Sequence, residues 1–203
     1  MLISPDELNS YDRFYRANLI NSLSGFKSAS LIGTKNQEGI SNLAIFSNIV
    51  HLGANPALIA FVNRPLEAAP HTLTNIEIIG FYTINHIHTD WVDKAHQTSA
   101  KYPEGVSEFN ACGFTEEYID GFTAPFVKES VIKYGMKLIE VVPIKHNNTF
   151  FVIGEVVIIS VPESIISPDG FIEADKANSC CSLGIDGYYS TELIARLPYA
   201  KAK

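Results

Sequence analysis

The sequence predicts a mainly β protein with flanking helices, whose strands pair antiparallel. Residues 29–48 contain two alternating runs joined by a short polar turn with a glycine, which is typical of a β-hairpin. Residues 57–63 form a compact apolar run after a proline, as expected for a buried strand. Two longer strand candidates, residues 137–145 and 149–161, are separated only by His-Asn-Asn, which indicates a second hairpin.

Helices are predicted around these strands. Residues 11–23 carry apolar side chains at near-helical spacing, so we expect an amphipathic helix that ends before Gly25 and has Ser10 as its cap. A short helix is expected from Pro70, followed by a strand at residues 79–85. Three further segments complete the prediction: a helix at residues 88–98 opened by Thr89 or Asp90, a helical piece at 172–177, and an irregular stretch at 99–130 expected to fold over a ligand pocket.

Length and composition limit the class of protein. The 203 residues suit one domain, 1–203, with a core at about 11–190, and the chain is 46% hydrophobic and 18% charged. A net charge of -7 argues against nucleic acid as a partner, because duplex binding needs a basic face. No apolar run is long enough for a bilayer and the N-terminus lacks signal-peptide features, so we expect no membrane partner and a cytoplasmic location.

The cysteines and histidines do not form a recognisable metal or disulfide framework. Cys112 is isolated, whereas Cys180 and Cys181 are adjacent, so all three are interpreted as free thiols. Around the predicted strand at 79–85 there are three histidines and two aspartates, without the convergent spacing of a catalytic metal site; these are His86, His88, His96, Asp90 and Asp93. The prediction is therefore that the chain binds no metal.

Polar residues surround the second arm of the first hairpin. Ser41, Asn42, Ser47 and Asn48 lie at both ends of an apolar centre, where small side chains let a flat ligand approach the backbone. Arg64 stands where the strand at 57–63 ends, a usual place for a ligand-facing residue. The amides at the start of the helix predicted from Pro70 would be free to bind an anion. Together these features indicate a ligand that is flat and carries an anionic group.

The order of motifs resembles a known family. "NPALIAFVNRP" at 55–65, "HTLTNI" at 71–76, "KYPEGVSEF" at 101–109 and "FFVIGEV" at 150–156 follow one another as in the flavin-reductase-like FMN-binding split barrels. Within that family the chain is most similar to the flavoredoxin-type branch, and the resemblance covers roughly residues 11–190. It implies an antiparallel split β-barrel of the FMN-binding type.

The resemblance also implies a set of cofactor-binding residues. A phosphate needs cations, hydroxyls and helix-terminal amides, and we assign Arg64, Ser47, His71 and Thr72 to it. Asn42, Ala44 and Phe46 would line the flavin ring, with Asn48 beside them. Ser99 and Lys101 would approach the phosphate from the loop side. For Ser47 and Asn48 the alternative is a simple strand-end polar residue, and for Ser99 and Lys101 a solvated helix terminus.

The implied function is an FMN-binding oxidoreductase, an NAD(P)H-dependent flavin reductase in which NADH or NADPH passes hydride to flavin N5. Two alternatives stay open: a flavoredoxin-like electron-transfer protein, or a flavin-binding module without turnover. His146 precedes "GEV" at 154–156 at a looser spacing than the nicotinamide-facing histidine of similar reductases. The family further implies a homodimer, with Tyr188-Tyr189 as a candidate for coverage across the interface, and an acceptor that is free flavin, oxygen or a partner protein.

Overall fold

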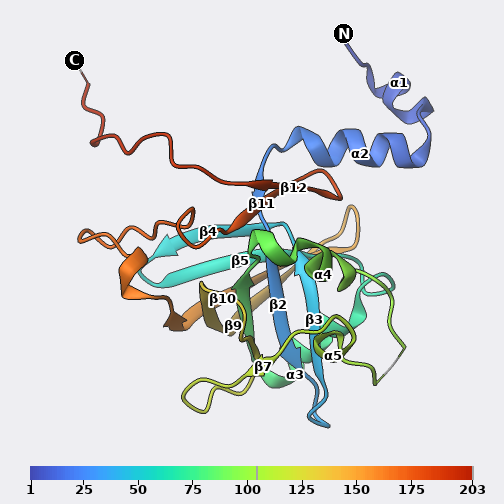
Figure 1. The fold of residues 1–203 in the computed structure, drawn as a ribbon. Coiled ribbons are helices and arrows are strands. Elements are labelled where there is room, and N and C mark those ends of the chain that lie inside the picture. The colour runs from blue at the N-terminus through green and yellow to red at the C-terminus, as the bar shows by residue number, and fades with distance from the viewer. Residues whose placement is uncertain (104, 203) are drawn as a thin grey trace.

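The computed structural model describes residues 1–103 and 105–202. Figure 1 shows strands gathered in a central body, with helices beside it and both chain ends projecting from one side. The helices are α1 (Pro5–Ser10), α2 (Arg13–Leu23), α3 (Pro70–Ile79), α4 (Val92–Gln97), α5 (Glu108–Ala111) and the 3-10 turns η1 (Thr89–Trp91) and η2 (Glu163–Ile165). The strands are β1 (Lys27–Ser28), β2 (Ser30–Lys35), β3 (Ser41–Phe46), β4 (Ile49–Ala54), β5 (Ala57–Asn63), β6 (Phe81–His86), β7 (Glu116–Glu117), β8 (Phe126–Val127), β9 (Lys133–Ile144), β10 (Thr149–Ser160), β11 (Cys180–Leu183) and β12 (Gly187–Ser190).

Seven strands form one antiparallel sheet in the order β3-β2-β6-β9-β10-β5-β4. Phe46 lies on β3, at one end of this order, and Phe61 lies on β5, next to the other end, yet their ring centroids are 4.9 Å apart. The sheet therefore curls on itself as a split barrel, as the sequence predicts. A second sheet, β1-β11-β12, and the pair β7-β8 are smaller.

The barrel closes around an apolar core. Its fully buried members come from the strands and from α3, which places its apolar face against β2 and β3; they are Ile32, Phe61, Leu73, Ile76, Tyr82, Ile84, Met136 and Val152. A second cluster lies where β2 and β3 meet α4 and α5, and it contains Leu31, Leu43, Ala95 and Phe109. Strand β3 thus separates two apolar clusters, because successive side chains of a strand point to opposite faces.

Most predicted strands are confirmed. The hairpin at residues 29–48 is β2 and β3, the run at 57–63 is β5, and the long hairpin is β9 and β10. Strand β4 is absent from the prediction because His51 and Gly53 interrupt its alternation, and the structure has a register shift against β5 between them. Gly154 marks a further register shift in β10, and a Cβ there would lie 2.3 Å from the hydroxyl of Tyr82.

Three helix predictions are wrong in detail. Asp12, not Ser10, caps α2, and its carboxylate accepts hydrogen bonds from the amides of Phe14 and Tyr15 at 2.8 and 3.3 Å. At the helix predicted over residues 88–98, His88 and not Thr89 or Asp90 is the cap. Its Nδ1 accepts a hydrogen bond from the amide of Asp90 at 3.0 Å, at the start of η1. Residues 172–177 contain no helix: Ile172 forms a β-bridge with Ile166, and residues 174–178 are turns. So short a segment gains little from helix propagation after its costly nucleation.

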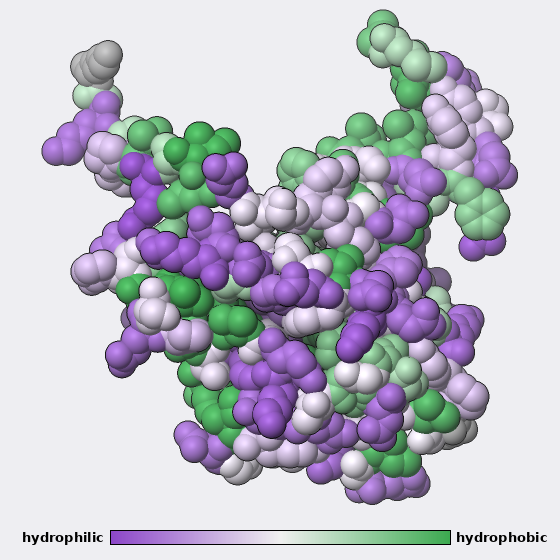
Figure 2. All heavy atoms as spheres, in the orientation of Figure 1, coloured by the Kyte–Doolittle hydropathy of each residue, from purple (hydrophilic) through white to green (hydrophobic). Residues whose placement is uncertain are grey.

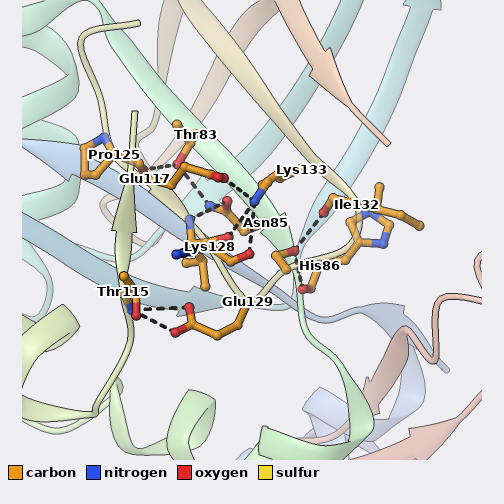
Figure 3. A network of polar contacts seen from close by, with 12 residues as sticks. Thr83, Asn85, His86, Thr115, Glu117, Pro125, Lys128, Glu129, Ile132 and Lys133 are labelled. Atoms are coloured by element: carbon orange, nitrogen blue, oxygen red, sulfur yellow. Dashed lines mark hydrogen bonds and ion pairs between the residues drawn. The ribbon is translucent and has the colours of Figure 1, made fainter. Parts of the chain in front are cut away.

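A buried polar network holds the segment 113–130 against the sheet (Figure 3). Lys133 on β9 is 6% exposed, and its ammonium pairs with Glu117 at 2.5 Å and donates to the carbonyls of Val127 and Lys128, each at 3.2 Å. Asn85 on β6 accepts from the amide of Val127 at 2.9 Å. Within residues 113–130 only the two-residue strands β7 and β8 are regular, and backbone groups of Pro125, Val127 and Lys128 bond to side chains of the sheet.

No helix in the described residues is both long and apolar enough to cross a bilayer.

Candidate functional site

The start of β3 is joined to the first turn of α3 by side chains. The amide of Asn42 donates to the hydroxyl of Thr72 at 3.3 Å, and the amide of Asn75, one turn along α3, donates to Thr34 on β2 at 3.1 Å. Asn42 and Thr72 are both buried, with 8% and 4% exposure. Buried amide and hydroxyl groups need such partners, so the two bonds fix the position of α3 against the hairpin.

The N-terminus of α3 is open to an anion. Pro70 occupies the first helical position, and Ala69 at the N-cap has no side chain that could satisfy the following amides. The first amides of a helix lack partners within it and lie at the positive end of its dipole. His71 is exposed beside them. This end of α3 has the donors and the field that favour a phosphate or carboxylate.

Asn63 brings Arg64 to the same corner. This asparagine, the last residue of β5, is fully buried, and its Nδ2 donates to the carbonyl of Arg64 at 2.7 Å and to that of Ala69 at 3.4 Å. Because Ala69 is the N-cap of α3, the exposed Arg64 is held near the start of the helix. The Oδ1 of Asn63 is buried without a hydrogen-bond partner. An unpaired buried acceptor in this corner suits a ligand that carries hydroxyl or N–H donors.

Asn42, Ala44 and Phe46 lie on one face of β3, since they are two residues apart. The distance along the strand from the first to the last is about 13 Å, at about 3.3 Å per residue. Ala44 and Phe46 are partly buried, and Phe46 packs edge to face against Phe61. The face thus offers a polar end at Asn42, a small residue in the middle and an aromatic end.

Ser47 lies away from the corner formed by Asn42 and Thr72. It follows the other end of β3 and lines a cavity of about 50 Å³ together with Ser182 and Tyr188. The hydroxyl of Ser182 is buried without a partner. Asn48 is exposed. The structure therefore groups Arg64, His71 and Thr72, and it places Ser47 and Asn48 at the opposite end of β3.

Ser99 and Lys101 are exposed in the loop after α4. The described contacts do not join them to Asn42 or Thr72, but the loop ends on β3, where the hydroxyls of Ser107 and Ser41 are 2.7 Å apart. Their part in cofactor binding stays a prediction.

Two residues of the candidate site, Asn63 and Glu108, are not predicted from the sequence. Glu108 at the start of α5 is 7% exposed, and its Oε2 accepts from the amide of Leu43 at 3.0 Å. This amide is free because β3 is an edge strand of its sheet. Burial raises the pKa of Glu108, opposed by this hydrogen bond and by the nearby His71. The sequence signal for Asn63 is a polar residue at the end of an apolar run. No comparable sequence signal marks Glu108.

Two of the histidines lie within hydrogen-bonding distance of hydroxyl groups, and the cysteines are not paired with one another. His86 Nδ1 lies 3.3 Å from Ser179 Oγ, and His96 Nδ1 lies 2.8 Å from Tyr188 Oη. Within the part of the chain that the structure describes, no three His, Cys, Asp or Glu residues are grouped to hold a metal. All three cysteines are free thiols, and burial raises the pKa of Cys180 to about 11.

A larger cleft, of about 400 Å³, is lined by residues that follow Arg64 in the sequence. It lies between the 64–69 loop and the tip of the β9–β10 hairpin, and its walls include Leu66, Glu67, Ile144, Lys145 and Phe150. Apolar walls with a few polar groups are usual for small-molecule sites. His146 is exposed in the hairpin turn and does not line the cleft.

Comparisons with known proteins agree with this architecture. Residues 25–171 match the flavin reductase-like domain, and the chain belongs to that family. It is 47% identical to a protein of Shewanella frigidimarina, assigned as a flavin reductase with a split-barrel domain, whose crystal structure matches with a TM-score of 0.95 over 98% of this chain and 100% of the other.

Two more distant structures share the fold. Nitrilotriacetate monooxygenase component B of Bacillus cereus is 21% identical, with a TM-score of 0.85 over 97% of this chain and 98% of the other. Flavoredoxin of Desulfovibrio vulgaris is 22% identical, with a TM-score of 0.75 over 88% and 94%.

Proposed function

We propose that this protein is an FMN-binding, NAD(P)H-dependent flavin reductase. The observation that carries the proposal is the corner where Asn42, Thr72, Arg64 and the open N-terminus of α3 meet, in a member of the flavin reductase-like family. FMN, when bound, accepts hydride from a nicotinamide at N5 and passes the electrons to an acceptor. The side chains of the protein position it.

The donor set fits a phosphate ester. The guanidinium of Arg64 supplies charge and a planar set of N–H groups, the hydroxyl of Thr72 can donate, and the amides after Pro70 complete a three-sided anion site. His71 adds a further donor at the exposed rim. The orphaned Oδ1 of Asn63 would accept from a hydroxyl of the ribityl chain. Ser99 and Lys101 are assigned to the loop side of the same phosphate.

The ring would lie along the face of β3 that carries Asn42, Ala44 and Phe46. Ala44 gives the room for close approach, and Phe46 and Phe61 form an apolar end. Ser47 and Asn48 would then serve the edge of the ring, rather than the phosphate, because they lie at the end of β3 away from Thr72. The cleft beside the 64–69 loop is the proposed entry for NADH or NADPH.

A flavoredoxin-like electron carrier is the second candidate. It is favoured by the position of His146, which is exposed in a turn and does not line the 400 Å³ cleft. Without a side chain that positions a nicotinamide, FMN would exchange electrons with a partner protein and would not be reduced by NAD(P)H.

We further propose that residues 1–203 act as one domain, in the cytoplasm, as a homodimer. The three free thiols support a reducing compartment. The homodimer is implied by the family resemblance, and free flavin, oxygen or another protein would accept the electrons.

An anaerobic absorbance spectrum of the purified protein with FMN tests the proposal. Flavin bands that bleach after NADH or NADPH is added support the reductase and identify the donor. Bands that persist with both nicotinamides, but bleach with dithionite, support the electron carrier. A protein that binds no FMN contradicts both.

A further inference from the structure

The 400 Å³ cleft beside the 64–69 loop has two walls. The loop wall is formed by Leu66 and Glu67, and the wall of the β9–β10 hairpin is formed by Pro143, Ile144, Lys145, Asn148, Thr149 and Phe150. Leu66 and Ile144 are each 37% exposed. Figure 2 shows a central body whose visible face is largely hydrophilic, with apolar side chains in separate groups. Exposed apolar surface inside a cleft, with a few polar groups around it, is typical of a small-molecule site.

The cleft adjoins the corner proposed to hold the FMN phosphate. Phe150, on the hairpin wall, is the register partner of Asn63 on β5, and Asn63 binds the carbonyls of Arg64 and Ala69. The cleft volume is at the lower end of the about 300–1,000 Å³ usual for ligand pockets. The cleft therefore suits one half of a dinucleotide whose other half extends past the corner to the flavin ring.

Lys145 supplies a free positive charge to this cleft. It is the one cation among the described residues that line the cleft. Glu67 lies on the opposite wall, but within residues 1–103 and 105–202 neither Lys145 nor Glu67 forms an ion pair. An ammonium group that no carboxylate neutralises attracts an anionic ligand.

The turn that follows Lys145 is held by its own hydrogen bonds. The amide of Asn147 donates to the carbonyl of Ile144 at 3.3 Å, and its Oδ1 accepts from the amide and the hydroxyl of Thr149 at 3.2 and 2.8 Å. Asn148 has a φ of 57°, a left-handed conformation that asparagine adopts more readily than most residues. Lys145 thus extends from a preformed turn, which lowers the cost of ordering the backbone when a ligand binds.

The two charges of the cleft match NADPH better than NADH. The two nucleotides differ only in the phosphate on the 2′-oxygen of the adenosine ribose, and in dinucleotide sites an acidic residue binds the ribose hydroxyls whereas a basic residue accommodates the 2′-phosphate. In NADPH the 3′-hydroxyl and the adenine amino group remain as donors for Glu67, and the 2′-phosphate is a partner for Lys145. NADH offers partners to Glu67 but leaves the ammonium of Lys145 without one.

We propose that the cleft binds the adenosine half of the nicotinamide dinucleotide and that Lys145 selects NADPH over NADH through the 2′-phosphate. Asn148, on the same wall, adds side-chain N–H donors for this phosphate. Leu66 and Ile144 provide apolar surface for the adenine ring. The inference rests on the proposed reductase function and names which nicotinamide the protein uses.

Calorimetric titration of the full chain with FMN added tests the cleft without any turnover. The probes are 2′,5′-ADP, which carries the 2′-phosphate, and 5′-AMP, which lacks it. We expect 2′,5′-ADP to bind about tenfold more tightly, the size of one charge-assisted hydrogen bond. Lys145→Ala should remove this difference, and Lys145→Arg should retain it because a guanidinium also binds phosphate.

The matched control is Lys137→Ala, since Lys137 is an exposed lysine of the same strand that does not line the cleft. This variant should distinguish the two probes as the wild type does. Equal affinity of the wild type for both probes, binding of neither probe, or an equal loss in Lys137→Ala and Lys145→Ala would overturn the proposal.

Anaerobic bleaching of the flavin separates this inference from the proposed function. We expect kcat/KM to be about tenfold higher with NADPH than with NADH, and Lys145→Ala to raise the KM for NADPH while the KM for NADH stays unchanged. Bleaching at equal rates by the two nicotinamides would overturn the selection of NADPH and leave the reductase intact. Bleaching by neither would contradict the reductase and this inference together.

Discussion

The amide of Asn42 donates to the hydroxyl of Thr72 across 3.3 Å and ties the start of β3 to the first turn of α3. Asn63 completes the corner from the other side by binding the carbonyls of Arg64 and Ala69. Two buried asparagines, far apart in sequence, thus place a cation, a hydroxyl and free helix amides within one small region.

Thr72 is expected to act through its hydroxyl. Thr72→Val keeps the shape of the side chain but removes both the acceptor for Asn42 and a donor to the phosphate, and we expect FMN affinity to fall by about 0.5–1.5 kcal/mol, the net value of a neutral hydrogen bond. Thr72→Ser retains the hydroxyl and should bind nearly as wild type. Flavin fluorescence titration measures both. Equal affinities for the Val and Ser variants would contradict this role.

Arg64 is expected to recognise the phosphate alone. Arg64→Ala should weaken FMN binding by about 1–3 kcal/mol, because a charge-assisted hydrogen bond is lost. Riboflavin has the same ring and no phosphate, so its affinity should not change. Since Arg64 is exposed, the variant should fold normally. If riboflavin and FMN lose affinity equally, Arg64 supports the ring or the loop and does not bind the phosphate.

The sequence was informative wherever local pattern determines structure. Alternation located β2 and β3, a compact apolar run located β5, the turn at residues 146–148 located the hairpin of β9 and β10, and the proline at position 70 located α3. It failed at β4, whose partner β5 imposes the strand despite Gly53, and at residues 172–177, where tertiary pairing of Ile172 with Ile166 prevails over local helical preference. Strand pairing with a neighbouring segment can determine the structure of a short stretch without leaving a periodic signal in it.

The sequence predicts which types of residue form the candidate site better than it predicts how those residues are placed relative to one another. Arg64 and Thr72 carry chemistry that the sequence displays, whereas the role of Asn63 depends on contacts with the chain before and after it. Its polarity at a strand end favours Ser47 as a phosphate ligand, but in the structure the length of β3 separates Ser47 from the Asn42–Thr72 contact. Distances between elements require the fold.

Glu108 is expected to protect the free edge of β3. Glu108→Ala leaves the buried amide of Leu43 without its acceptor and should cost about 1–3 kcal/mol of unfolding free energy. Glu108→Gln keeps an acceptor oxygen and should cost less. Burial raises the pKa of Glu108, so its contribution to stability is largest below the unfolded value of about 4.5 and is lost as the pH rises through the folded value.

Urea denaturation at pH 4 and pH 7 checks both parts. The stability of Glu108→Gln relative to wild type should improve from pH 4 to pH 7, because only the wild type ionises a buried carboxyl group. An identical difference at the two pH values would show that the pKa of Glu108 is the same in the folded and unfolded states. If Ala and Gln were equally destabilising, the hydrogen bond to Leu43 would contribute nothing.

His86 should make the fold sensitive to mild acid. Burial lowers its pKa to about 4 from the ordinary 6.5, beside Tyr134 and Ser179. The unfolded chain therefore binds a proton that the folded chain excludes, and stability present above pH 6.5 is lost as the pH falls toward 4, by about 2–3 kcal/mol. His86→Phe removes this dependence, so its stability relative to wild type should rise by that amount between pH 7 and pH 4.

Urea denaturation of both proteins measures this change in stability. The exposed His51→Phe is the control, which should keep the wild-type dependence of stability on pH. Parallel curves for wild type and His86→Phe would mean that His86 is protonated as readily in the folded protein as in the unfolded chain.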